Sequence, residues 1–166
     1  MTALLSLGTN LGDRLAYLRA AVAELRTTVP HTAFAVAPVY ETAPVDVPDE
    51  YKALNYLNTA VAIETNLPPE ELSRIIHLTE DKLGRVRTGY HSPRTVDIDL
   101  IACGEAVRNS PELTLPHPRA TQRRFVLQPL SDLCPDFILP GHSKNIAELL
   151  ALLPENQEIR RISDTL

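Results

Sequence analysis

The sequence predicts an α+β fold, with a small antiparallel sheet and helices packed against it. Three observations lead to this prediction. Short apolar runs of strand type alternate with longer segments whose apolar residues recur at helical spacing. Glycine and proline stand at the ends of most of these segments, where turns are expected. The order of the segments is strand, helix, strand, strand, helix, strand, which is the order of two βαβ units that share one sheet.

The first three elements lie before residue 43. Residues 2–9 (TALLSLGT) form a short apolar run and predict a strand. Residues 10–27 carry apolar side chains every three or four positions and predict a helix, with Asn10 as its N-cap. Residues 32–42 (TAFAVAPVYET) predict a second strand, in which Pro38 indicates an edge position or a bulge.

The next three elements complete the core. Residues 55–65 (NYLNTAVAIET) predict a strand that pairs antiparallel with the strand before it. Residues 68–84 predict a helix, because two prolines stand at its first turn and Gly84 ends it. Residues 95–104 (TVDIDLIACG) predict the last core strand. This is the pattern of a ferredoxin-like βαββαβ core.

The rest of the chain predicts a C-terminal helical elaboration of the same domain. It contains a short helix around residues 119–133, a helix at 144–153 and a final strand at 157–162. A length of 166 residues suits one domain, so we expect a single domain spanning residues 1–166.

Composition narrows the class of protein. The net charge of −5, from 16 basic and 21 acidic residues, disfavours a broad nucleic-acid surface. The sequence shows no signal-peptide pattern and no apolar run of membrane-spanning length, so we expect a cytoplasmic protein without a membrane partner. Cys103 and Cys134 lack metal-site spacing and are expected to be reduced thiols, with a disulfide or a zinc site as the alternatives.

Two aspartates in the last core strand suggest a metal site. Side chains alternate between the faces of a strand, so Asp97 and Asp99 share one face while Val96, Ile98 and Leu100 share the other. The two carboxylates would lie about 6.5–7 Å apart along the strand. Mg²⁺ prefers oxygen ligands, and paired carboxylates can bridge two such ions. The alternative is an ordinary solvated strand face.

Arginines around this strand favour a phosphate ligand. The chain uses 13 arginines and only 3 lysines, and arginines precede and follow the two aspartates in sequence. Guanidinium groups make forked, permanently charged contacts with phosphate oxygens. Carboxylates for magnesium with arginines for phosphate indicate a nucleoside triphosphate site, although local salt bridges or a bias toward arginine would give the same residues. The glycine-rich phosphate loop GxxxxGK[ST] is absent.

Six sequence segments then carry a family resemblance. SLGTNLGDR, YETAPV, YLNTAVAIET, GRVR, PRTVDIDLI and LTLPHPRATQRRFVLQPL occur in this order. Together they resemble the 6-hydroxymethyl-7,8-dihydropterin pyrophosphokinase family over roughly residues 4 to 140. The resemblance implies a ferredoxin-like fold and a role in folate biosynthesis. It also implies transfer of the pyrophosphoryl group of ATP to the hydroxymethyl oxygen of 6-hydroxymethyl-7,8-dihydropterin, with release of AMP.

The resemblance also implies residues for the ATP half of the site. Asp97 and Asp99 match the ligands of two Mg²⁺ ions, and with Arg85 and Arg94 they form the implied catalytic set. The positions matched to ATP contacts are Glu80, Arg85, Arg87, Arg94, Leu100, Thr114, His117 and Arg123. For His117, a purely structural loop histidine is the alternative.

For the pterin half, the resemblance implies a flat pocket. Asn58 offers one donor and one acceptor in a plane, which suits the amide edge of the ring. Tyr56 and Phe125 match the aromatic positions that sandwich the ring, although Phe125 can equally be ordinary core packing. The loop positions that line the pocket are Thr42, Ala43 and Val45.

Departures from the family pattern leave rival functions open. Family members commonly read Trp-Gly-Pro-Arg where residues 91–94 read His-Ser-Pro-Arg, so His91 or Tyr90 would have to replace the tryptophan. Glu112 and Pro118 suggest altered contacts to ATP. The rivals are a catalytically weakened pterin- or nucleotide-binding protein, a ferredoxin-like RNA-binding module and a magnesium-dependent phosphohydrolase. The enzyme is expected to act as a monomer on its two small substrates.

Overall fold

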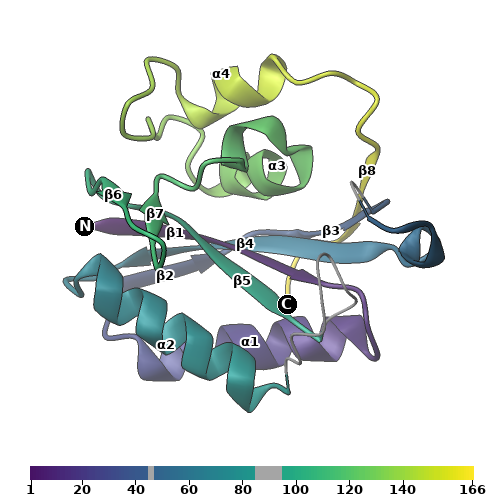
Figure 1. The fold of residues 1–166 in the computed structure, drawn as a ribbon, viewed down its shortest axis with the longest axis horizontal. Helices are drawn as coiled ribbons and strands as arrows, with labels where there is room; N and C mark the ends of the chain where they lie inside the picture. Colours follow the sequence, from purple (N-terminus) through teal and green to yellow (C-terminus); the bar gives the residue numbers. More distant parts are fainter. Residues whose placement is uncertain (45–46, 85–94) are drawn as a thin grey trace.

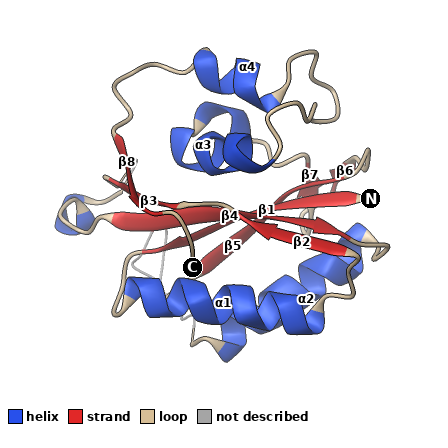
Figure 2. Ribbon diagram, turned by 180° about the vertical axis from the view of Figure 1, so that it is seen from behind, coloured by secondary structure: helices blue, strands red, loops and turns tan. Residues whose placement is uncertain are grey.

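The computed structural model describes residues 1–44, 47–84 and 95–166, and places a sheet between two layers of helices (Figure 1). Helices α1 (Arg14–Thr28) and α2 (Pro69–Lys82) cover one face of the sheet, and α3 (Arg124–Leu133) and α4 (Ile146–Ala151) lie over the other. Figure 2 shows the same three layers from behind. The predicted α+β class is confirmed.

The main sheet is antiparallel at every pairing in the described residues. Its strand order is β5-β1-β4-β3-β8, and β2 also pairs with β4. The predicted ferredoxin-like core is present, since β1 lies at its centre between β4 and β5. The predicted final strand adds to the edge of the core beside β3. The strands are β1 (Thr2–Thr9), β2 (Ala33–Val36), β3 (Val39–Thr42), β4 (Tyr56–Glu64), β5 (Asp97–Cys103) and β8 (Ile159–Ser163), with β6 (Arg108–Asn109) and β7 (Thr114–Leu115) forming a separate pair.

The start of α1 differs from the prediction. The N-cap is Asp13, whose Oδ1 accepts a hydrogen bond from the Ala16 N–H at 3.1 Å, and the predicted cap Asn10 lies before the helix. Gly12 has φ +69°, a conformation that glycine adopts without strain and that places a turn before the helix. Both residues are good N-caps by type, and this turn decides between them.

Prolines determine two other boundaries, of which the first was predicted and the second divides a segment that was predicted as one strand. Pro68 is the N-cap of α2 and Pro69 is its first residue, where the missing N–H leaves no intrahelical hydrogen bond unmade. The predicted strand 32–42 is split into β2 and β3 at Ala37–Pro38, because proline has no N–H to donate to a ladder. The predicted irregularity at Pro38 is therefore confirmed.

The C-terminal helices are shorter than predicted. Residues Ala120–Gln122 form a 3₁₀ turn, and α3 begins only at Arg124. Helix α4 covers Ile146–Ala151, and a capping box formed by Asn145 and Glu148 begins it. Another 3₁₀ turn, Asp49–Tyr51, lies in the loop between β3 and β4.

Each face of the sheet has its own apolar core. Leu5, Leu7 and Leu100 pack toward α1 and α2, whereas Leu4 and Ile101 pack toward α3 and α4. The alternation along β5 breaks at Ile101, because Leu4 pairs with Ala102 while Leu5 pairs with Leu100. Ile101 is thus the extra residue of a β-bulge, and it stays buried on the α3 side.

Cys103 and Cys134 are both free thiols, as expected. No helix in the described ranges is long and apolar enough to cross a membrane.

Candidate active site

Polar residues replace the apolar core at one end of the α3-facing side of the sheet. In the sheet register, Gly8 of β1 lies between Asp97 of β5 and Asn58 of β4. Leu7, Leu57 and Ile98, which alternate with these three positions, belong to the core on the opposite face. Asp97, Gly8 and Asn58 therefore form a row across three neighbouring strands. The predicted metal carboxylates and the predicted pterin amide meet at one place.

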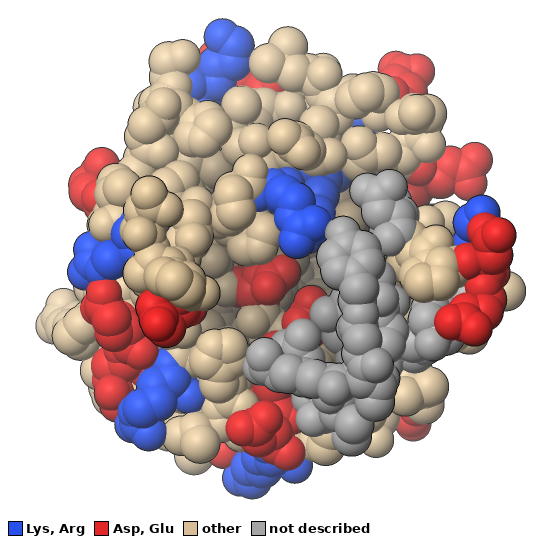
Figure 3. Space-filling view, viewed as in Figure 1, with Lys and Arg blue, Asp and Glu red and all other residues tan. Residues whose placement is uncertain are grey.

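A depression marks this part of the surface. Figure 3 shows acidic atoms set back near the middle of the view, with basic side chains directly above them. Asp97 and Asp99 are half-buried, whereas Val96, Ile98 and Leu100 are buried on the other face. The predicted alternation of faces along this strand is confirmed.

Two of the predicted ATP contacts lie on the opposite face of β5. The Glu80 carboxylate is fully buried, and its Oε1 accepts a hydrogen bond from the Ile98 N–H at 2.8 Å. Leu100 packs in the core against α1 and α2. The structure does not bring these two side chains to the carboxylates. Any contact of Leu100 with a nucleotide would have to come from its main chain, since β5 is an edge strand of the sheet.

The β-bulge holds His117 beside the carboxylates. Ile101 has no Cα partner on β1, and its carbonyl instead accepts a hydrogen bond from the His117 N–H at 2.9 Å. The preceding Leu115–Pro116 peptide bond is cis. His117 Nδ1 accepts a hydrogen bond from the Arg119 N–H at 3.2 Å, and Nε2 lies 3.9 Å from Asp99 Oδ2.

The charge state of His117 follows from its surroundings. Burial, followed by the positive charges of Arg123 and Arg119, lowers its pKa from 6.5 to about 4, against an opposing effect of Asp97. The nearby Asp99 carboxylate favours the charged ring, but at 3.9 Å its attraction is weaker than these effects. At neutral pH the ring is therefore neutral. Because Nδ1 is an acceptor, Nε2 carries the proton and is a hydrogen-bond donor on the side of Asp99.

This pKa predicts a pH-dependent stability. Between pH 6.5 and 4 the unfolded chain binds a proton at His117 that the folded chain does not, so stability falls as the pH decreases across this range. We expect this group to contribute a loss of about 3 kcal/mol. Urea unfolding of the protein without metal or nucleotide, at several pH values, measures it. The His117→Gln variant should have a correspondingly flatter profile, whereas the exposed control His142→Gln should follow the parent protein. Equal slopes for the two variants would contradict this pKa.

The start of α3 contributes an arginine and an aromatic ring. The Arg123 guanidinium carbon lies 5.5 Å from the centre of the Phe125 ring, within the range of a cation–π contact. Phe125 borders a hollow of about 340 Å³ together with Thr42 and Ala43. Three residues predicted for the pterin pocket or its rim are thereby brought together.

Asn58 is held in one orientation. Its side chain is buried, and Nδ2 donates a hydrogen bond to Thr42 Oγ1 at 2.7 Å. Tyr56 lies two residues earlier on the same strand, is half-buried, and projects to the same face. Thr42 and Tyr56 are also register partners on β3 and β4. Three of the predicted pterin residues, Thr42, Tyr56 and Asn58, thus cluster on two adjacent strands.

Thr114, Glu112 and Pro118 are exposed. Thr114 lies in β7, and its hydroxyl donates to the Ser110 carbonyl at 3.4 Å. The remaining predicted residues, Val45, Arg85, Arg87 and Arg94, lie outside the described residues, as do Tyr90 and His91.

Gly8 is a site residue that the sequence reasoning missed. A Cβ atom at this position would lie 3.0 Å from Asn58 Oδ1 and 4.0 Å from Tyr56 Cδ1. The strand therefore needs glycine where it passes the amide of Asn58. A glycine inside a strand pattern often indicates such a close approach, and that signal was present in the sequence.

This contact predicts the effect of Gly8→Ala. The new methyl group must push the Asn58 carbonyl oxygen aside, although its amide nitrogen is held by Thr42. We expect the KM for the pterin to rise about tenfold, the size of losing one good hydrogen bond. The KM for ATP, measured in the same assays, is the internal control. Equal changes in both KM values would show a general distortion of the sheet instead.

The described site combines paired carboxylates, a neutral histidine and arginine side chains on one face of a ferredoxin-like sheet. These features are typical of an enzyme that transfers a phosphorus-containing group. A family model described as 7,8-dihydro-6-hydroxymethylpterin-pyrophosphokinase matches residues 4–135. The chain belongs to this family, and it is a pyrophosphokinase of folate biosynthesis.

Curated relatives agree with this membership. The chain is 41% identical over 132 residues to the 2-amino-4-hydroxy-6-hydroxymethyldihydropteridine pyrophosphokinase of Bacillus subtilis, covering 80% of this chain and 77% of the relative. It is 35% identical over 149 residues to the enzyme of that name from Pseudomonas aeruginosa, covering 90% of each. A folic acid synthesis protein of Schizosaccharomyces pombe is 35% identical over 97% of this chain, which spans only 21% of that protein.

Solved structures show the same fold at low sequence identity. An HPPK-DHPS protein in complex with substrates matches 90% of this chain with a TM-score of 0.68 at 12% identity. HPPK-DHPS of Plasmodium falciparum matches 90% of it with a TM-score of 0.67 at 16% identity. This chain spans 43% and 42% of those two proteins, so it is similar to less than half of each.

Proposed function

We propose that residues 1–166 form one domain that transfers the pyrophosphoryl group of ATP to 6-hydroxymethyl-7,8-dihydropterin. The observation that carries the proposal is the row of Asp97, Gly8 and Asn58 on three adjacent strands. Carboxylates suited to a metal-bound triphosphate and an amide suited to a pterin are separated by a single strand, about 4.8 Å from each of its neighbours. A phosphorus atom and a pterin hydroxyl bound at these two positions would be neighbours.

In the pterin half, each residue has a distinct role. Asn58 presents Oδ1 and Nδ2 in one plane, which suits the paired donor and acceptor of the pterin amide edge. Tyr56 and Phe125 would stack on the two faces of the ring. Thr42, Ala43 and Val45 would line the pocket.

In the ATP half, the donor set fits magnesium. Asp97 and Asp99 offer hard carboxylate oxygens on one strand face, and two such residues leave coordination positions for phosphate oxygens and water. The described residues contain no group of three or more His, Cys, Asp or Glu that could hold a metal. These side chains therefore do not form a complete coordination shell by themselves. We propose that Asp97 and Asp99 hold two Mg²⁺ ions, which when bound would offset the charge of the triphosphate.

Basic and neutral donors would position the phosphates. Arg123 supplies a forked donor and His117 a neutral Nε2–H beside Asp99. Further proposed contacts come from Thr114, Arg87 and the main chain near Leu100. Glu80 is proposed to support this main chain, because its buried carboxylate accepts a hydrogen bond from the Ile98 N–H. Arg85 and Arg94 are proposed as catalytic residues from the resemblance of the segments that contain them. Phosphoryl transfer depends mainly on positioning and charge stabilisation, which is what these groups provide.

The reaction then balances as one substitution at phosphorus. The hydroxymethyl oxygen forms a bond to the β-phosphorus, and the bond from this phosphorus to the oxygen that bridges to the α-phosphorus breaks. AMP leaves with that oxygen, and the hydroxyl proton is released. The enzyme is proposed to act as a monomer, since both halves of the site come from one chain.

The test is AMP formation from ATP and Mg²⁺, measured with and without 6-hydroxymethyl-7,8-dihydropterin. We expect AMP only when the pterin is present, together with an equal amount of the pterin pyrophosphate ester. ATP consumption that does not depend on the pterin would instead indicate a hydrolase. Pterin binding without AMP formation would indicate a binding protein and would overturn the proposal.

A further inference from the structure

The helix that carries Phe125 has no cap of its own. Its N-cap residue, Arg123, has extended backbone angles and makes no side-chain capping hydrogen bond. The first N–H groups of a helix have no partner within the helix, so another group must satisfy them. Here the N–H of Arg124 donates a hydrogen bond of 2.8 Å to Oε1 of Gln157, which lies 33 residues later.

Gln157 uses both ends of its amide. Its Nε2 donates a hydrogen bond of 3.2 Å to the carbonyl of Gln122. One side chain therefore binds the residue before Arg123 and the residue after it. The main chain at Arg123 is held from both sides, at the point where the chain turns into α3.

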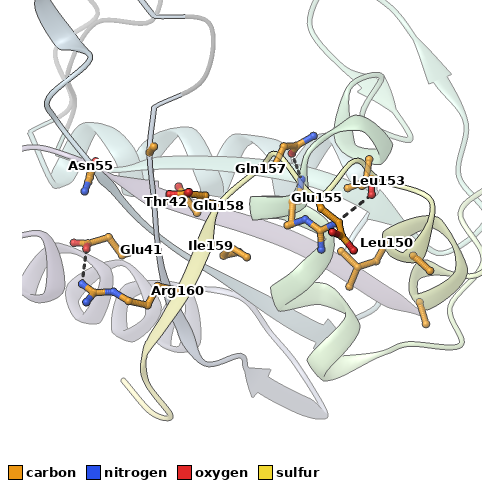
Figure 4. Close-up of a pocket in the computed structure, with 14 residues that line it drawn as sticks. Glu41, Thr42, Asn55, Leu150, Leu153, Glu155, Gln157, Glu158, Ile159 and Arg160 are labelled. Carbon is orange, nitrogen blue, oxygen red and sulfur yellow. Dashed lines mark hydrogen bonds and ion pairs between the residues drawn. The ribbon is translucent and has the colours of Figure 1, made fainter.

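Arg124 binds the same C-terminal segment in return. Its Nη2 donates hydrogen bonds to the carbonyls of Leu153 at 3.3 Å and Pro154 at 3.4 Å. Figure 4 shows Gln157 and Leu153 at the ends of two of these hydrogen bonds, on the wall of a hollow of about 810 Å³. Four hydrogen bonds thus join the start of α3 to residues 153–157.

The next residues of the segment are joined to the strand that leads into the pterin loop. Ile159 pairs with Thr42 in the register of β8 and β3, and Arg160 pairs with Glu41. Arg160 Nη2 also lies 2.7 Å from Glu41 Oε1. The C-terminal segment therefore contacts both the strand that ends at Thr42 and the helix that begins beside Phe125.

The end of β3, the start of α3 and the C-terminal segment also meet at one hollow. Thr42, Ala43, Phe125 and Gln157 all line the hollow of about 340 Å³ at the edge of the candidate pterin site. Gln157 is half-buried there, whereas its neighbour Asn156 is exposed. A shift at Gln157 would move the backbone beneath Arg123 and Phe125 relative to the loop at Thr42.

We propose that Gln157 is a positioning residue for the transfer reaction. Its amide fixes the backbone on both sides of Arg123, and so sets Phe125 against Thr42 and Ala43. This inference rests on the proposed function, because Phe125 and Arg123 are its proposed pterin and phosphate contacts. The role needs one donor and one acceptor in the same side chain, which distinguishes glutamine from glutamate.

Three variants test this role. Gln157→Ala removes both hydrogen bonds, and we expect the KM for the pterin to rise about tenfold, the size of losing a helix cap. Gln157→Glu keeps an acceptor for the Arg124 N–H but places a carboxylate against the Gln122 carbonyl. Its KM for the pterin should therefore lie between that of the parent protein and that of Gln157→Ala. Asn66→Ala, an exposed amide beyond the other end of β4, is the control and should leave the KM unchanged. KM does not depend on the fraction of active enzyme, so partial unfolding does not imitate the effect.

Hydrogen exchange at the Arg124 amide gives a second readout that does not require activity. Exchange should be faster in Gln157→Ala than in Asn66→Ala. Either of two results overturns the proposal. One is a pterin KM in Gln157→Ala equal to that of the control, and the other is an unchanged exchange rate at the Arg124 amide. Absence of pterin-dependent AMP in the parent protein would refute the proposed function instead. In that case the dissociation constant of 6-hydroxymethylpterin, measured from the fluorescence of the pterin, replaces KM in the comparison of the same variants.

Discussion

The Asp97→Asn variant is expected to form AMP at a rate about a thousandfold below that of the parent protein. Removing one group that stabilises transition-state charge lowers rates by about 10² to 10³, and here a proposed metal ligand is lost as well. Asn is almost the same size as Asp, and Asp97 lies half-buried beside Gly8, so the strand should keep its place. The variant therefore isolates the charge of the carboxylate.

The measurement is the initial rate of pterin-dependent AMP formation at saturating substrates over a range of Mg²⁺ concentrations. Asp136→Asn makes the same chemical change at an exposed position before α4 and should keep the parent rate. If Asp97→Asn retained more than a tenth of the activity at ordinary Mg²⁺ concentrations, the proposed metal role of this carboxylate would be wrong.

The second large effect is expected for Asn58→Asp. This change replaces the Nδ2 donor by a second acceptor, so the pterin amide edge loses a partner, whereas the Thr42 hydroxyl can still donate to the new carboxylate. It also places a carboxylate at a position where the side chain is only 3% exposed. We expect the pterin KM to rise about a hundredfold, because the pterin edge would lose one hydrogen bond and would face a buried charge in place of a neutral amide.

Asn55→Asp provides the matched control for this variant. Asn55 lies three residues earlier, is exposed, and undergoes the same chemical change. Its KM for the pterin should match that of the parent protein. Circular dichroism of both variants checks that the sheet is intact. A pterin KM for Asn58→Asp within threefold of the control would exclude Asn58 as the residue that hydrogen-bonds to the amide edge of the pterin.

Period-two alternation made part of the site predictable. Val96, Ile98 and Leu100 are buried on one face of β5, with Asp97 and Asp99 on the other, because a strand has no other way to place them. The helix boundaries at Pro68 and Pro69 were predictable for a similarly local reason. Local rules of this kind also predicted the element order and hence the fold class.

Other parts depend on contacts that local rules do not contain. Gln157 and Arg124 are far apart in sequence, and only the path of the chain after α4 brings them together. The low pKa of His117 depends on burial that follows from the bulge at Ile101. The choice of Asp13 over Asn10 as the cap of α1 depends on the turn at Gly12. Each of these features is set by tertiary structure.

The central position of β1 has a consequence for how the protein folds. Thr2 pairs with Glu64, and Ala3 pairs with Cys103, so both neighbours of this strand come from distant parts of the sequence. During synthesis, β1 leaves the ribosome long before β4 and β5, and until then its two edges have no strand to pair with. Loop-closure entropy must be overcome before such distant pairings form, which makes folding slow compared with that of a helical bundle of similar size. Until residue 103 emerges, the nascent chain therefore carries an unpaired strand edge, and this edge favours aggregation.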